Sequence, residues 1–224
     1  MMGVTRLTAS ATPTSSGHLI MHFTHVRNLP GILEAGCIQA DSLVDRGSAL
    51  LVEAADLGIK AARKKIRITV APYGCVADYV PFYFAPQSPM LYKLAKGSVL
   101  TYTDGQDPLV YLVSTVGAVV EAGLPYLFSD GNCAAAVTQV SGDLALLESM
   151  VDWAVMRAQM WNNTAEDPDR MRRRMAEFLV HERVPLRHMA GIAVRTERMR
   201  ERVDETLTAH GITLPVRVRP NWYY

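Results

Sequence analysis

The chain has 224 residues, of which 49% are hydrophobic and 20% charged, and its formal net charge at pH 7 is +1. These values are typical of one globular domain with its own core and exclude a fully disordered or low-complexity protein. No run of 18 or more uncharged apolar residues occurs, so no membrane-spanning helix is expected.

The N-terminal segment differs from the rest in composition. Residues 1–17 are rich in Ser, Thr and Ala and lack the apolar core of a signal peptide. They predict a flexible tail followed by a single domain over residues 18–224. The cysteines Cys37, Cys75 and Cys133 are far apart and lack the spacing of a disulfide framework or a zinc site. We therefore expect a cytoplasmic protein without a metal.

The first regular element is a short apolar strand over Leu19–His25. A helix is expected over 31–35, with Asn28 as its N-cap and Pro30 in its first turn, where the missing N–H costs nothing. Gly36 is a suitable residue to end this helix. The segment 41–72 has poor periodicity apart from a helical stretch at about 51–65.

The rest of the chain alternates short strands and short helices, which indicates an α+β domain. Strands are recognised by apolar, β-branched or aromatic runs, and helices by their spacing of apolar residues. Expected strands are 79–84, 109–113, 126–128, 190–194 and 216–218, and expected helices are 116–122, 150–159, from 167 to about 180, and 195–209.

Two segments concentrate positive charge. One spans residues 60–67 and the other residues 170–174, and each contains at least four lysines or arginines. Local positive potential of this kind is what a nucleic-acid-binding protein needs, whatever its overall charge. A solvated helix face has the same pattern, so charge alone decides nothing.

Two sets of side chains are candidates for chemistry. Because side chains alternate along a strand, His22 and Thr24 share one face and His25 lies on the other; a pair of this kind suits a ribose or an amide. Glu177 lies in an apolar hexapeptide, where a carboxylate must be paired, protonated or functional. An ion pair with an arginine of the 170–174 run is the structural alternative for Glu177.

Several segments together resemble one family, the DarT DNA ADP-ribosyltransferase toxins, over roughly residues 19–224. Each segment alone is weak, but their order along the chain is specific. They are His22-Phe23-Thr24-His25 with Asn28-Leu29-Pro30-Gly31, Asp78-Tyr79-Val80-Pro81-Phe82-Tyr83-Phe84 with Ser88-Pro89-Met90-Leu91, Ser129-Asp130-Gly131-Asn132, Asp167-Pro168-Asp169 with Ala176-Glu177-Phe178-Leu179-Val180, and Arg219-Pro220 with Trp222-Tyr223-Tyr224.

The resemblance implies an ADP-ribosyltransferase fold, a split mixed β core with peripheral helices. It also implies transfer of ADP-ribose from NAD to thymidine or guanosine of single-stranded DNA. Glu177 then falls on the catalytic glutamate and Arg63 on a second catalytic residue, which also contacts NAD. Further NAD contacts fall on His22, Thr24, His25 and Gly31. As a family member the chain would be a toxin, and its expected partner is a macrodomain antitoxin.

The chain departs from the family pattern at two positions. Gln87 stands where many members have arginine, and we expect this change to alter contacts to DNA or NAD. Asn221 replaces a common glycine. Arginine is a poor base, because its pKa exceeds about 12; we expect Arg63 to act as a charge clamp. Two alternatives remain open: an ADP-ribosyltransferase acting on RNA or protein, and a catalytically silent nucleic-acid-binding module. The aromatic residues Tyr73, Tyr92 and Trp161 are either stacking platforms for bases or ordinary core residues.

Overall fold

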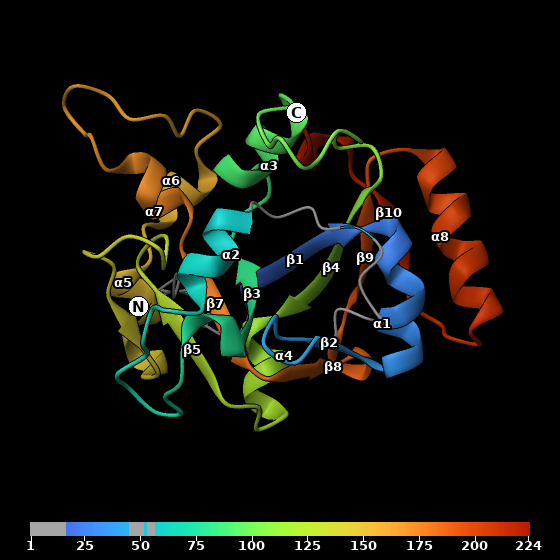
Figure 1. Ribbon diagram of the computed structural model, residues 1–224, viewed down its shortest axis with the longest axis horizontal. Coiled ribbons are helices and arrows are strands. Elements are labelled where there is room, and N and C mark those ends of the chain that lie inside the picture. The colour runs from blue at the N-terminus through green and yellow to red at the C-terminus, as the bar shows by residue number, and fades with distance from the viewer. Residues whose placement is uncertain (1–16, 45–51, 53–56) are drawn as a thin grey trace, which may run out of the picture.

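The computed structural model describes residues 17–44, 52 and 57–224. The predicted flexible tail lies outside the described residues except for Gly17. Residues 51 and 53–56 of the helix predicted at 51–65 lie outside them as well. A mixed sheet runs through the middle of the molecule, in the order β10-β9-β4-β1-β3-β7-β5-β6. Figure 1 shows this sheet with α5, α6 and α7 at one end and α8 at the other. The predicted α+β architecture is confirmed.

The strands of the sheet are antiparallel to their neighbours except that β10 is parallel to β9. A separate two-stranded pair, β2 with β8, lies below it in Figure 1. The strands are β1 Leu19–His25, β2 Cys37–Gln39, β3 Tyr79–Tyr83, β4 Leu109–Thr115, β5 Tyr126–Ser129, β6 Val140–Ser141, β7 Glu177–His181, β8 Arg183–Pro185, β9 Gly191–Val194 and β10 Val216–Val218.

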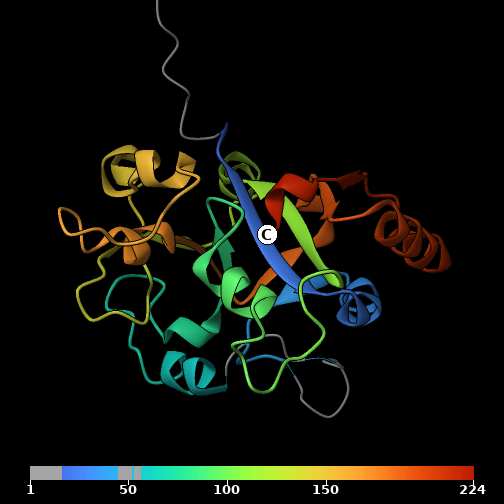
Figure 2. The same cartoon turned by 90° about the horizontal axis from the view of Figure 1, so that it is seen from above.

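Short helices cover both faces of the sheet. Helices α1, α4 and α8 pack their apolar residues on one face, whereas α3 and the C-terminal tyrosines pack on the other. The view from above in Figure 2 shows α8 standing away from the sheet at one end. The helices are α1 Leu29–Ala35, α2 Leu57–Arg63, α3 Pro89–Ala95, α4 Val116–Glu121, α5 Leu147–Met150, α6 Trp153–Arg157, α7 Arg170–Arg174 and α8 Glu197–Ala209.

The start of the chain follows the prediction closely. Strand β1 has the predicted bounds, and α1 ends at Gly36, whose φ of 66° is the left-handed conformation that glycine adopts without strain. Helix α1 begins at Leu29, two residues earlier than predicted. Asn28 occupies the N-cap position, but its side chain makes no capping hydrogen bond there.

Two predicted helices differ from the structure. The helix expected over 150–159 is two helices, α5 and α6, because Val151 has an extended backbone and the side chain of Asp152 caps α6. The helix expected from 167 to about 180 ends at Arg174, and residues 177–181 form β7. Strand β7 pairs with β3 and β5 on its two sides, so these sheet contacts override the local helical pattern.

The sheet is split between β1 and β3. Strand β1 pairs with β4 along its whole length, but with β3 only at Met21 and Tyr83. Pro81 interrupts the pairing of these two strands. Its carbonyl oxygen points toward β1 and accepts a hydrogen bond from His22 Nδ1 at 2.9 Å. Because the N–H and C=O of one strand residue point to the same side, the missing N–H of proline is also on this side. The β1–β3 ladder therefore cannot continue, and the two strands separate.

Candidate active site

A cleft lies where β1 and β3 separate. Its larger lobe is about 200 Å³, and an adjoining lobe of about 90 Å³ extends toward α1 and β2. The side chains of β1 and β3 form its two walls, and α2 contributes Ile59, Lys60 and Arg63 to its lining. The residues of the larger lobe with polar side chains are His22, Thr24, Asn28, Gln39, Asp41, Lys60, Arg63, Tyr79 and Tyr83.

His22 presents a neutral ring to this cleft. A carbonyl oxygen can only accept, so the hydrogen bond to Pro81 places the ring proton on Nδ1 and leaves Nε2 as an acceptor. Burial lowers the pKa of His22, and the nearby charges of Arg63 and Lys60 lower it further. The ring therefore accepts hydrogen bonds at neutral pH, as a sugar hydroxyl or an amide N–H requires.

Glu177 forms an ion pair with Arg63, which lines the cleft, and lies behind that side chain. Arg63 Nη1 lies 3.1 Å from Oε1 and 2.9 Å from Oε2 of Glu177, whose side chain is 2% exposed. Burial alone would lower the pKa of Arg63, but the carboxylate of Glu177 raises it above its usual value. Arg63 Nη2 is buried and has no hydrogen-bond partner among the described residues. The guanidinium is thus held permanently charged with one donor group free for a ligand.

The end of β5 and the residues after it also hold Glu177, Ser129 through the backbone and Cys133 through the carboxylate. The Ser129 hydroxyl accepts a hydrogen bond from Glu177 N–H at 2.9 Å and donates one to the Gly131 carbonyl at 2.7 Å. The backbone N–H of Cys133 lies 3.4 Å from Glu177 Oε1. Burial and the charge of Glu177 both raise the pKa of the Cys133 thiol, which therefore stays protonated.

Comparison with known proteins identifies this arrangement. The family model described as "ssDNA thymidine ADP-ribosyltransferase, DarT" matches residues 21–224. The chain belongs to the DarT family. A DNA ADP-ribosyl transferase of Mycobacterium tuberculosis is 35% identical over 209 residues, which cover 92% of this chain and 89% of that protein.

Solved structures agree with this assignment. DarT of Thermus sp. 2.9 in complex with ADP-ribosylated single-stranded DNA superposes with a TM-score of 0.85 at 34% identity, covering 92% of this chain and 96% of that one. The same protein in complex with NAD+ gives a TM-score of 0.82 at 32% identity, covering 92% and 98%. A transferase–glycohydrolase fusion protein of Thermosipho africanus is 25% identical over 92% of this chain and 49% of its own length.

Most of the site residues expected from the DarT resemblance come together. His22, Thr24 and Arg63 line the larger lobe of the cleft, and Gly31 lines the smaller one. His25 is not brought to the cleft: its ring is buried on the other face of β1, 3.2 Å from Asp104. Because side chains alternate along a strand, the ring of His25 faces away from His22 and Thr24.

The arginine run 170–174 does not pair with Glu177, contrary to the structural alternative for that carboxylate. Arg174 is buried and donates to four backbone carbonyls, whereas Arg172 and Arg173 are bound by aspartates. Most of this positive charge is therefore neutralised or buried inside the protein. Asp167 and Asp169 are close to these arginines in the sequence, whereas Asp130 and Asp152 are 42 and 21 residues away and could not be recognised as partners from charge alone.

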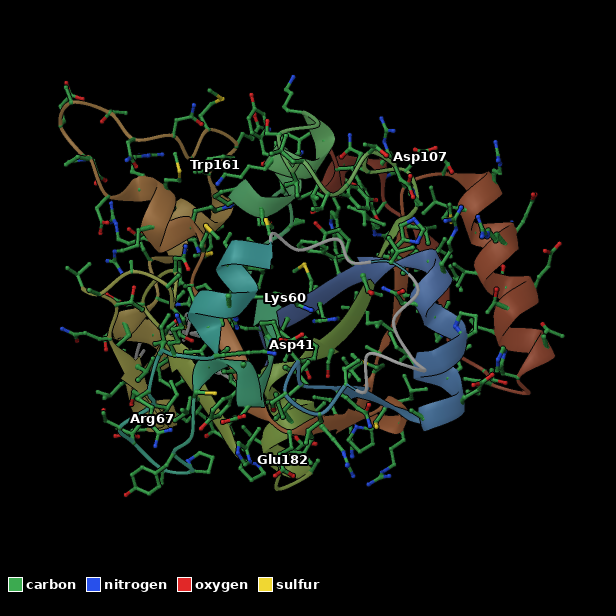
Figure 3. All side chains as sticks on the ribbon, in the orientation of Figure 1. Asp41, Lys60, Arg67, Asp107, Trp161 and Glu182 are labelled. Atoms are coloured by element: carbon green, nitrogen blue, oxygen red, sulfur yellow. The ribbon has the colours of Figure 1, made fainter. Side chains whose placement is uncertain are left out.

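Gln87, the departure from the DarT pattern, faces the C-terminus. Its side-chain Nε2 donates to the Tyr223 carbonyl at 2.7 Å, and its backbone carbonyl accepts from the Tyr224 hydroxyl at 2.5 Å. Trp161, labelled in Figure 3, is buried and donates to the same Tyr224 hydroxyl. Trp161 is thus a packing residue, whereas Tyr73 and Tyr92 are exposed.

Several cleft residues were not expected from the sequence. Asn28 is the clearest case: it is buried, and its amide bonds both the N–H and the C=O of Val52, which also lines the cleft. Asp41 and Lys60 form an ion pair of 2.5 Å beside it, and Figure 3 shows them in the middle of the molecule. An asparagine placed before Pro30 reads as a helix cap, so its true partner at Val52 has no local sequence signal.

The described part of the chain has neither a membrane-spanning helix nor a metal-binding cluster. None of its helices has the length and apolar character needed to span a bilayer. Within residues 17–44, 52 and 57–224, no cluster of three histidine, cysteine or carboxylate side chains is arranged to hold a metal ion.

Proposed function

We propose that this chain transfers ADP-ribose from NAD to thymidine of single-stranded DNA and releases nicotinamide. The observation that carries the proposal is the ion pair between the buried Glu177 and Arg63, a lining residue of the split-sheet cleft, in a chain of the DarT family. The Thermus relative has been solved both with NAD+ and with ADP-ribosylated single-stranded DNA, which supports both substrates.

Glu177 acts on the sugar in this proposal. Cleavage of the bond between ribose and nicotinamide builds positive charge on the ribose, as in glycoside hydrolysis. Nicotinamide leaves as a neutral molecule, so no acid has to protonate it. A carboxylate that binds the ribose 2′-hydroxyl stabilises this charge, and a preorganised group of this kind contributes about 3–4 kcal/mol.

The carboxylate has one acceptor position left for that hydroxyl. Two oxygens offer about four lone-pair sites, and Arg63 Nη1 and Cys133 N–H fill three of them. Arg63 and Tyr83 line the cleft in front of Glu177. Changes in the rotamers of these two side chains therefore admit the sugar to the carboxylate.

Arg63 serves as a charge clamp. Its raised pKa excludes it as the base that removes a proton from thymine. Its unpartnered Nη2 suits a diphosphate oxygen or the negative charge that develops on the attacking base. His22 Nε2 and the Thr24 hydroxyl bind the polar groups of NAD, and Gly31 borders the smaller lobe without adding a side chain. We exclude His25 from this set because it lies on the far face of β1.

A single-stranded acceptor follows from the chemistry. A ring nitrogen that is used in base pairing cannot attack while it is paired, so an unpaired base avoids the cost of opening a duplex.

The Thermosipho relative is a fusion of transferase and DNA ADP-ribosyl glycohydrolase. This supports a partner activity that removes ADP-ribose from DNA, and we propose that a macrodomain antitoxin supplies it to this chain, which would act as the toxin.

The test uses NAD labelled in the ADP-ribose part, with single-stranded oligonucleotides, the matching duplexes, RNA and lysate protein. We expect label on thymidine-containing single strands, and mass spectrometry of the nucleosides to show ADP-ribosyl thymidine. Glu177→Gln should lower the rate by about 10²–10³-fold, whereas Glu205→Gln, the same change on the exposed side of α8, should not. Label on RNA or protein alone, or a fully active Glu177→Gln enzyme, would refute the proposal.

A further inference from the structure

The turn that follows β5 controls one of the hydrogen bonds to Glu177. Residues 130–133 form this turn, and the donor to Glu177 Oε1 is the backbone N–H of Cys133. A backbone donor points wherever the turn directs it, so its alignment depends on whatever holds residues 130–133. Ser129 contributes by bonding the Gly131 carbonyl.

Arg172 contacts the first three residues of this turn, Asp130, Gly131 and Asn132. Its Nη1 donates to Asp130 at 3.1 Å, and its backbone carbonyl accepts from Asn132 N–H at 3.0 Å. Between them the guanidinium lies against Gly131, where an added Cβ would be 2.3 Å from Nη1 and 3.0 Å from the carbonyl oxygen. Nη1 also donates to Thr138, whose hydroxyl in turn bonds the Asn132 carbonyl.

Arg172 is itself held in place. Its Nε and Nη2 form a two-pronged pair with Asp169 at 2.8 and 2.7 Å, and its side chain is 15% exposed. The hydrogen bonds to Asp169 and Asp130 raise its pKa, so it remains charged. The planar guanidinium is suited to joining two carboxylates at once, which a lysine cannot do with the same geometry.

We propose that Arg172 is a positioning residue for Glu177. It lies in α7, five residues before Glu177, so one short segment carries both the carboxylate and the side chain that holds the turn opposite it. The turn and the carboxylate therefore keep a fixed relation, and Cys133 N–H stays directed at Oε1. This inference rests on the proposed role of Glu177.

A different role for Arg172 makes the opposite prediction. The run 170–174 has the charge pattern of a DNA-binding segment, and an arginine that binds a phosphate contributes to affinity and to its salt dependence. A positioning residue instead affects the rate of the chemical step at saturating substrate. The two roles are separated by measuring kcat, the KM for NAD and the Kd for the oligonucleotide on the same variants.

The variants are Arg172→Ala, Arg172→Lys and Gly131→Ala, with Arg200→Ala as the matched control. Like Arg172, Arg200 joins two carboxylates, which in this case both lie in its own helix, α8. Helix α8 is at the other end of the molecule (Figure 1). Arg172→Ala should lower kcat about 10–100-fold, the size of loss caused by small displacements in an active site. The KM for NAD and the Kd for DNA should stay within about twofold of wild type.

Gly131→Ala should lower kcat in the same direction although it removes no charge, and Arg172→Lys should fall between Arg172→Ala and wild type. These two variants decide the question if Arg172→Ala does not fold. A weaker Kd with unchanged kcat at saturating DNA would overturn the proposal, as would a folded variant with the wild-type kcat. If wild-type protein labels no DNA, the proposed function fails, and nicotinamide release from NAD by the same variants then tests Arg172.

Discussion

Replacing Arg63 by lysine separates the ion pair of this guanidinium from its second donor group, Nη2, which has no partner among the described residues. Nη1 alone contacts both oxygens of Glu177, so one ammonium group can take over that ion pair. The buried Nη2 has no counterpart in lysine. We expect Arg63→Lys to keep the stability of wild type within about 1 kcal/mol and to lose about 10²-fold in transfer rate, the range for one preorganised donor.

Arg63→Ala provides the contrast, because it leaves the nearly buried carboxylate of Glu177 without its cation. Breaking a buried ion pair on one side costs about 3–5 kcal/mol. For a chain of 224 residues, each kcal/mol corresponds to about 2–4 °C in Tm, so a fall of about 6–20 °C is expected. The double variant Arg63→Ala, Glu177→Gln should recover part of this loss.

The assays are thermal unfolding by circular dichroism and labelling of a thymidine-containing oligonucleotide at saturating NAD. A fully active Arg63→Lys enzyme would show that Nη2 binds nothing important in the reaction. An unchanged Tm in Arg63→Ala would show that Glu177 is not confined as the structure indicates.

Two further predictions concern the walls of the cleft. Asn28→Ala should raise the KM for NAD several-fold with kcat little changed, since Val52 loses both backbone hydrogen bonds that fix it; steady-state kinetics measure this, and an unchanged KM would contradict it. Burial lowers the pKa of His22 in the folded protein below its usual value of 6.5. At acidic pH the unfolded chain therefore binds more protons than the folded one, and stability decreases as the pH is lowered. Wild-type Tm should therefore fall between pH 7 and 5, and His22→Gln, measured by the same melts, should reduce that fall; an identical pH dependence in both proteins would contradict the buried neutral ring.

Local patterns predicted the first wall of the cleft well. Strand β1 and the turn at Gly36 depend on alternation and on a backbone conformation that one residue type adopts, and both are properties of a few adjacent residues. The shared face of His22 and Thr24 follows from the same alternation. The structure brings both to the cleft.

Glu177 shows where local patterns stop. The sequence predicted a helix through residue 180, because an apolar run as short as Phe178–Val180 is compatible with either helix or strand. Pairing with β3 and β5 decides for a strand. The partner of Glu177 is Arg63, 114 residues earlier in the chain. The family resemblance marked both residues, whereas the sequence alone left open a pairing of Glu177 with a neighbouring arginine.

Pro81 has a consequence for how the cleft can diversify. Because this residue lacks a donor, the seam between β1 and β3 is held by one backbone pair and one imidazole. The opening is therefore built into the main chain and does not depend on the size of the side chains around it. Substitutions on either wall can alter what the cleft accepts without closing it.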